Sequence, residues 1–170
     1  MSVIIKANYE DRPKFLEIWM EFMKEERKGG SYIHTTTKNL LNYVGYFDAY
    51  TMGQMFGACL FWMPQPGDTP KGVIMVGEGI KIGEWDTDRP ECAILWGVYV
   101  YPEFRGSNIG LELEQAACPE ALKLGFHHVE TTVRLANKGG ERVALAFGTK
   151  AESELHVADL RERMKELSHG

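Results

Sequence analysis

Apolar and polar positions along the chain follow two different periods, and these predict an alternation of strands and helices. A short apolar run at residues 3–6 predicts a first strand. Asp11 is a good helix cap and is followed by Pro13, after which apolar side chains recur at helical spacing. We expect this helix to end at the glycine pair 29–30.

The middle of the chain is rich in aromatic residues, which favour strands. After a second, shorter helix that starts near residues 36–37, the runs 46–50 and 54–63 predict an antiparallel hairpin around a short turn. Three prolines and a glycine predict a loop at residues 64–71, and a further strand is expected within residues 72–82.

An almost wholly apolar run, residues 92–100, is typical of a central strand that is buried on both faces. Pro102 ends this strand because proline cannot donate a hydrogen bond to a sheet. An amphipathic helix is predicted over residues 109–124, with Pro119 kinking or splitting it and Gly125 ending it.

The C-terminal part of the chain predicts four more elements. They are a strand at residues 128–134, a short helix at 137–147, a last strand at 152–158 and a charged helical tail at 160–167. Because no repeat or interdomain linker interrupts the pattern, residues 1–170 are expected to form a single domain of the α/β (α+β) class.

The composition is that of an ordinary soluble protein: 44% of the 170 residues are hydrophobic, 25% are charged, and the net charge is −5. It excludes disordered, collagen-like and disulfide-stapled chains, and it gives no broad attraction for nucleic acid or anionic membranes. No signal-peptide pattern and no apolar run of roughly 20 residues is present. Cys59, Cys92 and Cys118 lack zinc spacing and are expected to be reduced thiols, which predicts a cytoplasmic protein.

Residues 98–110 carry the most informative pattern, namely a buried strand, a tight turn, a glycine-containing loop and the start of a helix. The first N–H groups of a helix have no partner within the helix, and the helix dipole adds partial positive charge there. Gly106 and Gly110 remove side chains that would block a close approach, and Arg105 adds a fixed charge. These features together predict a site that binds a phosphate group.

Other known binding motifs fit less well. No phosphate-binding loop of the G-x-x-x-x-G-K-[ST] type is present, and Ile82 stands where a dinucleotide fingerprint starting at Gly77 needs its third glycine. His127 and His128 alternate across the predicted strand, so both cannot face one ion, and we expect no metal site.

The segment Val100-Tyr-Pro-Glu-Phe-Arg-Gly-Ser-Asn-Ile-Gly110 resembles motif A of the GNAT acyltransferase superfamily, in which the loop binds the pyrophosphate of acetyl-coenzyme A (acetyl-CoA). The order of predicted elements also resembles the layout of that family, a mixed central sheet flanked by helices. Asn108 replaces the middle glycine of the family pattern, and asparagine is the side chain that best tolerates left-handed backbone angles. Asn137 fits the asparagine of a second family pattern, whose usual tyrosine is here Ala144.

The resemblance implies direct attack of a substrate amine on the thioester of acetyl-CoA, with acetyl-CoA as co-substrate. The N–H group of Val100 is expected to polarise the thioester carbonyl. Glu91 is the candidate base, and the alternative is that it is a solvated loop carboxylate without a catalytic role. The residues expected to contact acetyl-CoA are Val98, Tyr99, Val100, Arg105, Gly106, Ser107, Asn108, Ile109, Gly110 and Asn137.

Two function classes stay open at this point. The first is an N-acetyltransferase that acts on an amine of a small molecule or of a protein. The second is a GNAT-like structural or interaction module that has lost catalysis, with or without binding of coenzyme A. Two residues favour this alternative: Asn108, and Ala144 in place of the family's proton-donating tyrosine. The acceptor amine is not encoded in any motif, and a homo-oligomer or a protein partner is left open.

Overall fold

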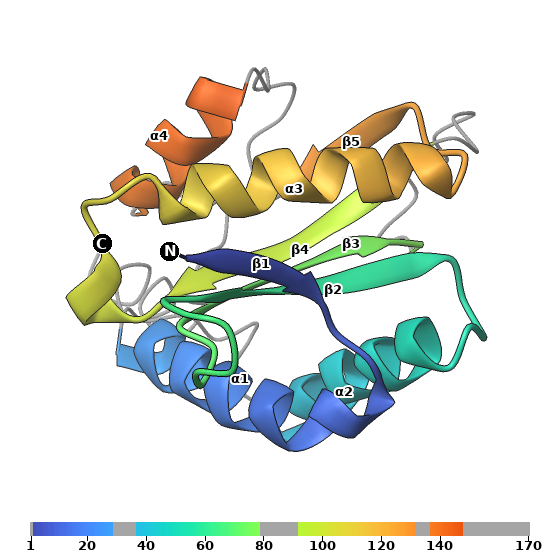
Figure 1. Cartoon of the computed structure of the whole chain (residues 1–170), viewed down its shortest axis with the longest axis horizontal. Helices are drawn as coiled ribbons and strands as arrows, with labels where there is room; N and C mark the ends of the chain where they lie inside the picture. The colour runs from blue at the N-terminus through green and yellow to red at the C-terminus, as the bar shows by residue number, and fades with distance from the viewer. Residues whose placement is uncertain (1, 29–36, 79–91, 132–136, 148–170) are drawn as a thin grey trace, which may run out of the picture.

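The structure is a computed structural model that describes residues 2–28, 37–78, 92–131 and 137–147 (Figure 1). Within these ranges five strands form one sheet in the order β1-β2-β3-β4-β5. All neighbouring strands are antiparallel except β4 and β5, which are parallel. The strands are β1 (Val3–Lys6), β2 (Gly57–Met63), β3 (Gly72–Gly77), β4 (Cys92–Val100) and β5 (His128–Thr131).

Helices cover both faces of this sheet, as expected for a mixed sheet flanked by helices. Helices α1 and α2 lie on one face, α3 lies on the other, and α4 packs on the N-terminal half of α3 (Figure 1). The helices are α1 (Arg12–Lys28), α2 (Thr37–Thr51), α3 (Ile109–Lys123) and α4 (Lys138–Phe147), with short 3-10 turns η1 (Tyr9–Asp11) and η2 (Pro102–Phe104).

Strands β2 and β3 are buried along their whole length because each contributes side chains to two separate cores. Phe61, Val73 and Met75 pack with α1 and α2, whereas Ile74 and Val76 pack with α3. The sheet therefore separates an aromatic core under α1 and α2 from a mainly aliphatic core under α3.

Several predicted elements are confirmed. The strands at residues 3–6 and 92–100 have the expected bounds, and the helix after Asp11 runs to Lys28. Helix α3 ends before Gly125, whose φ of +91° is the left-handed conformation typical of a helix stop. The predicted last strand at 152–158 and the helical tail at 160–167 lie outside the described residues.

The predicted strand at residues 46–50 is wrong, because this segment belongs to α2. Tyr43, Phe47 and Tyr50 are spaced three and four residues apart, and all three are buried in the core that α1 and α2 share, where Tyr43 and Phe47 contact rings of α1. The aromatic composition suggested a strand, but the spacing is helical and tertiary packing decides. Strand β2 consequently starts at Gly57, and no hairpin precedes it in residues 37–56.

Two further expectations need correction. Pro119 does not split α3, which runs from Ile109 to Lys123, and both Pro119 and Gln115 are exposed. Proline has no N–H group, so Pro119 cannot donate to the carbonyl of Gln115 four residues earlier. Because both residues are exposed, this carbonyl can face water. Strand β4 lies inside the sheet, but Ile94, Val98 and Val100 are only half-buried.

Strand β4 contains a β-bulge that the sequence reading did not include. Val73 pairs with Tyr99 and Met75 pairs with Trp96, so β4 has one residue more than β3 in this interval. Gly97 lies in the interval with a φ of +34°. A Cβ atom on Gly97 would lie 3.1 Å from Cη2 of Trp19 in α1, so the bulge is closely packed.

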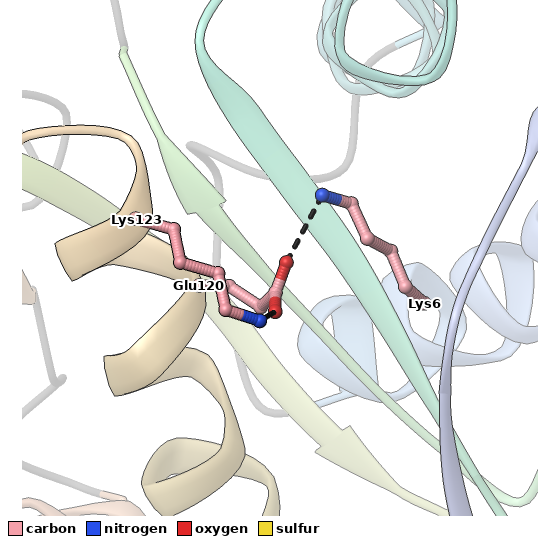
Figure 2. Close-up of polar contacts among 3 residues, drawn as sticks. All are labelled: Lys6, Glu120 and Lys123. Carbon is pink, nitrogen blue, oxygen red and sulfur yellow. Dashed lines mark hydrogen bonds and ion pairs between the residues drawn. The ribbon is translucent and has the colours of Figure 1, made fainter.

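The edge strand β1 is tied to α3 by an ion cluster (Figure 2). Glu120 on α3 accepts from Nζ of Lys6 at 3.0 Å and from Nζ of Lys123 at 2.6 Å. The hydrogen bond from Lys123, followed by that from Lys6, lowers the pKa of Glu120. The pair with Lys6 joins residues that are 114 positions apart in the chain.

Replacing Gly97 by alanine is expected to lower the free energy of unfolding by about 1–3 kcal/mol, because the new methyl group meets Trp19 and the positive φ disfavours a side chain. Urea denaturation measures this change. Gly45→Ala in α2 is the control, since a Cβ there meets nothing within 4 Å, and it should be neutral or stabilising by about 0.5–1 kcal/mol. Equal effects of the two substitutions would contradict the packing described for the bulge.

Glu120→Gln is expected to lower the free energy of unfolding by about 0.5–1 kcal/mol at neutral pH and low salt. A carboxyl with a lowered pKa stabilises the fold above its unfolded pKa, here near 4.5, and this contribution is lost as the pH falls through the folded pKa. The difference from the unsubstituted protein should therefore vanish at low pH and shrink in high salt. Glu141→Gln, which breaks a pair confined to α4, is the control; a difference that persists in acid would argue against the ion cluster.

Candidate functional site

The turn from β4 to α3 is closed by local hydrogen bonds. The N–H group of Arg105 donates to the carbonyl of Pro102 at 3.1 Å, and Oγ of Ser107 donates to the carbonyl of Phe104 at 2.7 Å. Gly106 has a φ of +81°, and a Cβ there would meet nothing within 4 Å. The backbone conformation at this position therefore requires glycine, and the space that a side chain would occupy is open.

The start of α3 presents a row of unpartnered donors. Within the described part of the chain, the backbone N–H groups of residues 106–111 have no acceptor, and the first bond of the helix runs from Glu112 to the carbonyl of Asn108. Residues 106–108 are exposed, Gly110 and Leu111 are half-buried and Ile109 is buried, so the row begins at the surface of the protein. Such a row at a helix N-terminus binds anions, and it matches the phosphate site that the sequence predicts.

The side chain of Arg105 turns back toward β4 and α1. Its Nε donates to the carbonyl of Val100 at 2.8 Å, and its Nη2 pairs with Glu25 of α1. The guanidinium lies 5.5 Å from the ring centroid of Tyr99. Arg105 therefore fixes the turn, and its charge is shared with Glu25, so the candidate anion site would rely mainly on backbone N–H groups.

The last residues of β4 offer a second row of backbone groups. The N–H group of Tyr101 donates to Lys71 beside β3, whereas the carbonyl of Val100 faces away from β3 and accepts from Arg105. Since backbone groups alternate along a strand, the N–H groups of Val98 and Val100 point to the side of β5. In the described ranges β4 pairs with β5 only from Cys92 to Leu95, so this part of the edge lacks a described partner strand.

The side chains of β4 divide between the two faces. Val98 and Val100 pack toward the core under α3, while Tyr99 is buried in the core under α1 and α2. Burial, followed by the nearby charge of Glu25, raises the pKa of Tyr99. Tyr99 supports the site through its backbone and through Arg105, and its side chain lies on the opposite face of the sheet from α3.

Three positions outside the turn's glycines bear on the resemblance: Asn108 and Ala144 differ from the family pattern, and Asn137 fits it. Asn108 has a φ of −80°, so the position does not need left-handed angles. Asn137 caps α4, because its Oδ1 accepts from the N–H group of Gly140 at 2.9 Å. Ala144 is buried in α4. Ile109 is also buried and anchors the start of α3 against the sheet, while Gly110 is half-buried beside it.

The remaining expectations concern the base, the cysteines, metal binding and membrane spans. Glu91, the expected base, lies outside the described residues. Cys92 begins β4, but its side chain is not described. Cys59 and Cys118 are free thiols. No cluster of three or more metal-ligating side chains occurs among the residues that are described. None of the described helices combines the length and the apolar character needed to cross a bilayer.

Sequence reasoning missed three groups near this site. The bulge at Gly97 was signalled only by a glycine inside an apolar run. Glu25 gave no signal, since its pairing with Arg105 joins segments 80 residues apart. Glu114 was not singled out in the sequence, and the structure buries it.

Comparison with known proteins places this geometry in a family. Residues 10–148 match the sequence model of the Acetyltransferase (GNAT) family. The chain has no sequence match among curated proteins.

Solved structures share the fold at low sequence identity. A predicted acetyltransferase with acetyl-CoA from Clostridium acetobutylicum is 15% identical, with a TM-score of 0.70 over 95% of this chain and 98% of that one. The aminoglycoside 6′-N-acetyltransferase AAC(6′)-IG from Acinetobacter haemolyticus is 12% identical, with a TM-score of 0.62 over 92% and 97%. AAC(6′)-Iy in complex with the bisubstrate analogue CoA-S-monomethyl-acetylneamine is 12% identical, with a TM-score of 0.69 over 94% and 97%.

The family match spans most of the chain, it includes the strand, turn and helix that form the anion site, and the fold agrees with it. The chain therefore belongs to the GNAT family of acetyltransferases.

Proposed function

We propose that the protein is an N-acetyltransferase that transfers an acetyl group from acetyl-CoA to a primary amine by direct attack. The observation that carries this proposal is the row of N–H groups at residues 106–111, which have no partner among the described residues and of which residues 106–108 are exposed. A diphosphate is a ligand of suitable charge for such a row, because it accepts several hydrogen bonds at once. Acetyl-CoA bound there supplies an activated thioester and a thiolate leaving group.

The end of β4, which lacks a partner strand among the described residues, gives the proposed site its second part. Val98 and Val100 present N–H groups on the side of β5, and amide groups of the pantetheine arm are suitable partners for such an edge. In this proposal the N–H group of Val100 donates to the thioester oxygen. Holding the amine beside the thioester lowers the barrier by several kcal/mol, up to about 7–11 in ideal cases.

Proton transfer is the least ordinary part of the proposed reaction. Ala144 has no proton to give, so the thiolate leaves without the tyrosine that the resemblance implies. Thiolates are stable enough near neutral pH for this, since an ordinary thiol has a pKa of roughly 8.5. Glu91, directly before β4, is the proposed base for the amine.

Two measurements separate this function from a binding module without catalysis. Isothermal calorimetry with acetyl-CoA tests whether the cofactor binds. A thiol-release assay over a panel of small amines, aminoglycosides and peptides with free α- or ε-amino groups then tests transfer. Binding without thiol release for any amine would support the structural or interaction module, and absence of binding would contradict both proposals for the site.

Asn108→Asp is expected to weaken binding of acetyl-CoA by about tenfold to a hundredfold, because it places a negative charge beside the first N–H groups of α3. Aspartate is as good a helix cap as asparagine, so the free energy of unfolding should stay the same or rise by up to about 1 kcal/mol. Calorimetry and urea denaturation measure the two quantities.

The matched control for this substitution is Asn8→Asp. Asn8 caps η1 through a 2.8 Å hydrogen bond from the N–H group of Glu10 and is also exposed, but it follows β1 at the other edge of the sheet. It introduces the same charge without approaching the anion site. If both variants bind acetyl-CoA as tightly as the parent protein, the diphosphate is not held at the start of α3.

A further inference from the structure

Helix α3 has two flanks with different surroundings. Its central stripe, Leu113, Ala117 and neighbours one turn apart, faces the sheet. On one flank Glu112 accepts from Nε1 of Trp62 in β2 at 3.1 Å, and Glu120 pairs with Lys6 in β1. That flank therefore faces β1 and β2, and the opposite flank faces β4, β5 and α4.

Glu114 lies on this opposite flank, one position after Leu113 and therefore about 100° around the helix from it. Only 4% of Glu114 is exposed, and its Oε2 has no hydrogen-bond partner among the described residues. Burial raises the pKa of Glu114 to about 7. A buried carboxyl oxygen without a partner is costly, so its presence calls for a partner that the described residues do not provide.

The position of Glu114 relative to the anion site suggests that partner. It lies four residues after Gly110, which is about 6 Å along the axis of α3 at 1.5 Å per residue. Because α3 returns along the sheet from the end of β4, a ligand chain that leaves the N-terminus of α3 along the part of β4 without a described partner strand passes this flank. The pantetheine arm of coenzyme A is such a chain, and it carries two secondary amides and a hydroxyl group.

We propose that Glu114 is a binding residue for the pantetheine arm, accepting a hydrogen bond from one of its N–H or O–H groups. This inference rests on the proposed function, because it requires the diphosphate to bind at residues 106–111. It adds a selectivity device: the backbone N–H groups of α3 recognise any diphosphate, whereas Glu114 recognises the arm that distinguishes coenzyme A from other nucleotides.

Two probes separate these contributions in calorimetry on the full chain. Coenzyme A carries the arm, and 3′-phosphoadenosine 5′-diphosphate carries the same nucleotide and diphosphate without it. Glu114→Leu is expected to lower the affinity for coenzyme A about tenfold, the size of one hydrogen bond, and to leave the affinity for the truncated nucleotide unchanged. The same substitution should raise the melting temperature by a few degrees, because an apolar side chain replaces an unpartnered buried carboxyl.

Glu114→Gln retains an acceptor oxygen in the same place and should bind coenzyme A within about threefold of the parent protein. Glu112→Leu removes a carboxylate from the other flank and is the matched control, expected to leave the preference for coenzyme A over the truncated nucleotide unchanged. Equal binding of coenzyme A by Glu114→Leu and the parent protein, or an equal loss for both probes, would overturn the proposal. If the parent protein binds neither probe, the proposed function fails first and this inference fails with it.

Discussion

One side chain, Arg105, joins the elements that meet at the candidate site. It donates to the carbonyl of Val100 at the end of β4, pairs with Glu25 on α1 and lies over the ring of Tyr99. These contacts fix the direction in which the chain leaves β4 and therefore where α3 begins. Because Arg105 closes the turn through its side chain, the backbone N–H groups that follow it stay available for a ligand.

Two local departures from ordinary packing occur around the same strand. Gly97 introduces a bulge with a positive φ into β4, and Glu114 places a carboxyl in the interior on the flank of α3 that faces β4 and β5. Each costs stability that a regular strand or an apolar side chain would retain. Such departures are expected where function and stability compete, and here they lie on different faces of the sheet: Gly97 packs against Trp19 of α1, and Glu114 belongs to α3.

Much of the fold is predictable because its elements bury continuous apolar patterns. The run at residues 92–100 and the helical spacing after Asp11 each specify one element, and the structure has both with the expected bounds. Residues 46–50 were misassigned because their composition favours a strand, whereas contacts with α1 select a helix. Local composition does not contain those contacts.

The backbone part of the site is similarly local, and the interactions around it are not. A strand, a turn and a helix start are adjacent in sequence, so the row of N–H groups without a helical partner at residues 106–111 follows from the pattern alone. The pairing of Arg105 with Glu25 and the burial of Glu114 depend on how α1 and α4 pack. Sequence spacing does not reveal either contact. The sequence therefore predicted that the positive charge of Arg105 is available to a ligand, whereas in the structure Glu25 pairs with it.

The two faces of the sheet have differently packed cores, and the start of α3 and Glu114 both lie on the face under α3. Under α1 and α2, stacked rings fill the interior, with Phe15 and Phe47 only 4.4 Å apart between centroids and Trp19 packed beside them. Under α3, small side chains such as Ala117 and Ala121 accompany the buried Glu114. Rings bury more apolar area per residue than alanine does, so the two cores are packed differently. The core under α3 also contains large side chains such as Leu113 and Ile74, and next to them lie the buried carboxyl of Glu114 and the start of α3, which are the features that a ligand can complete.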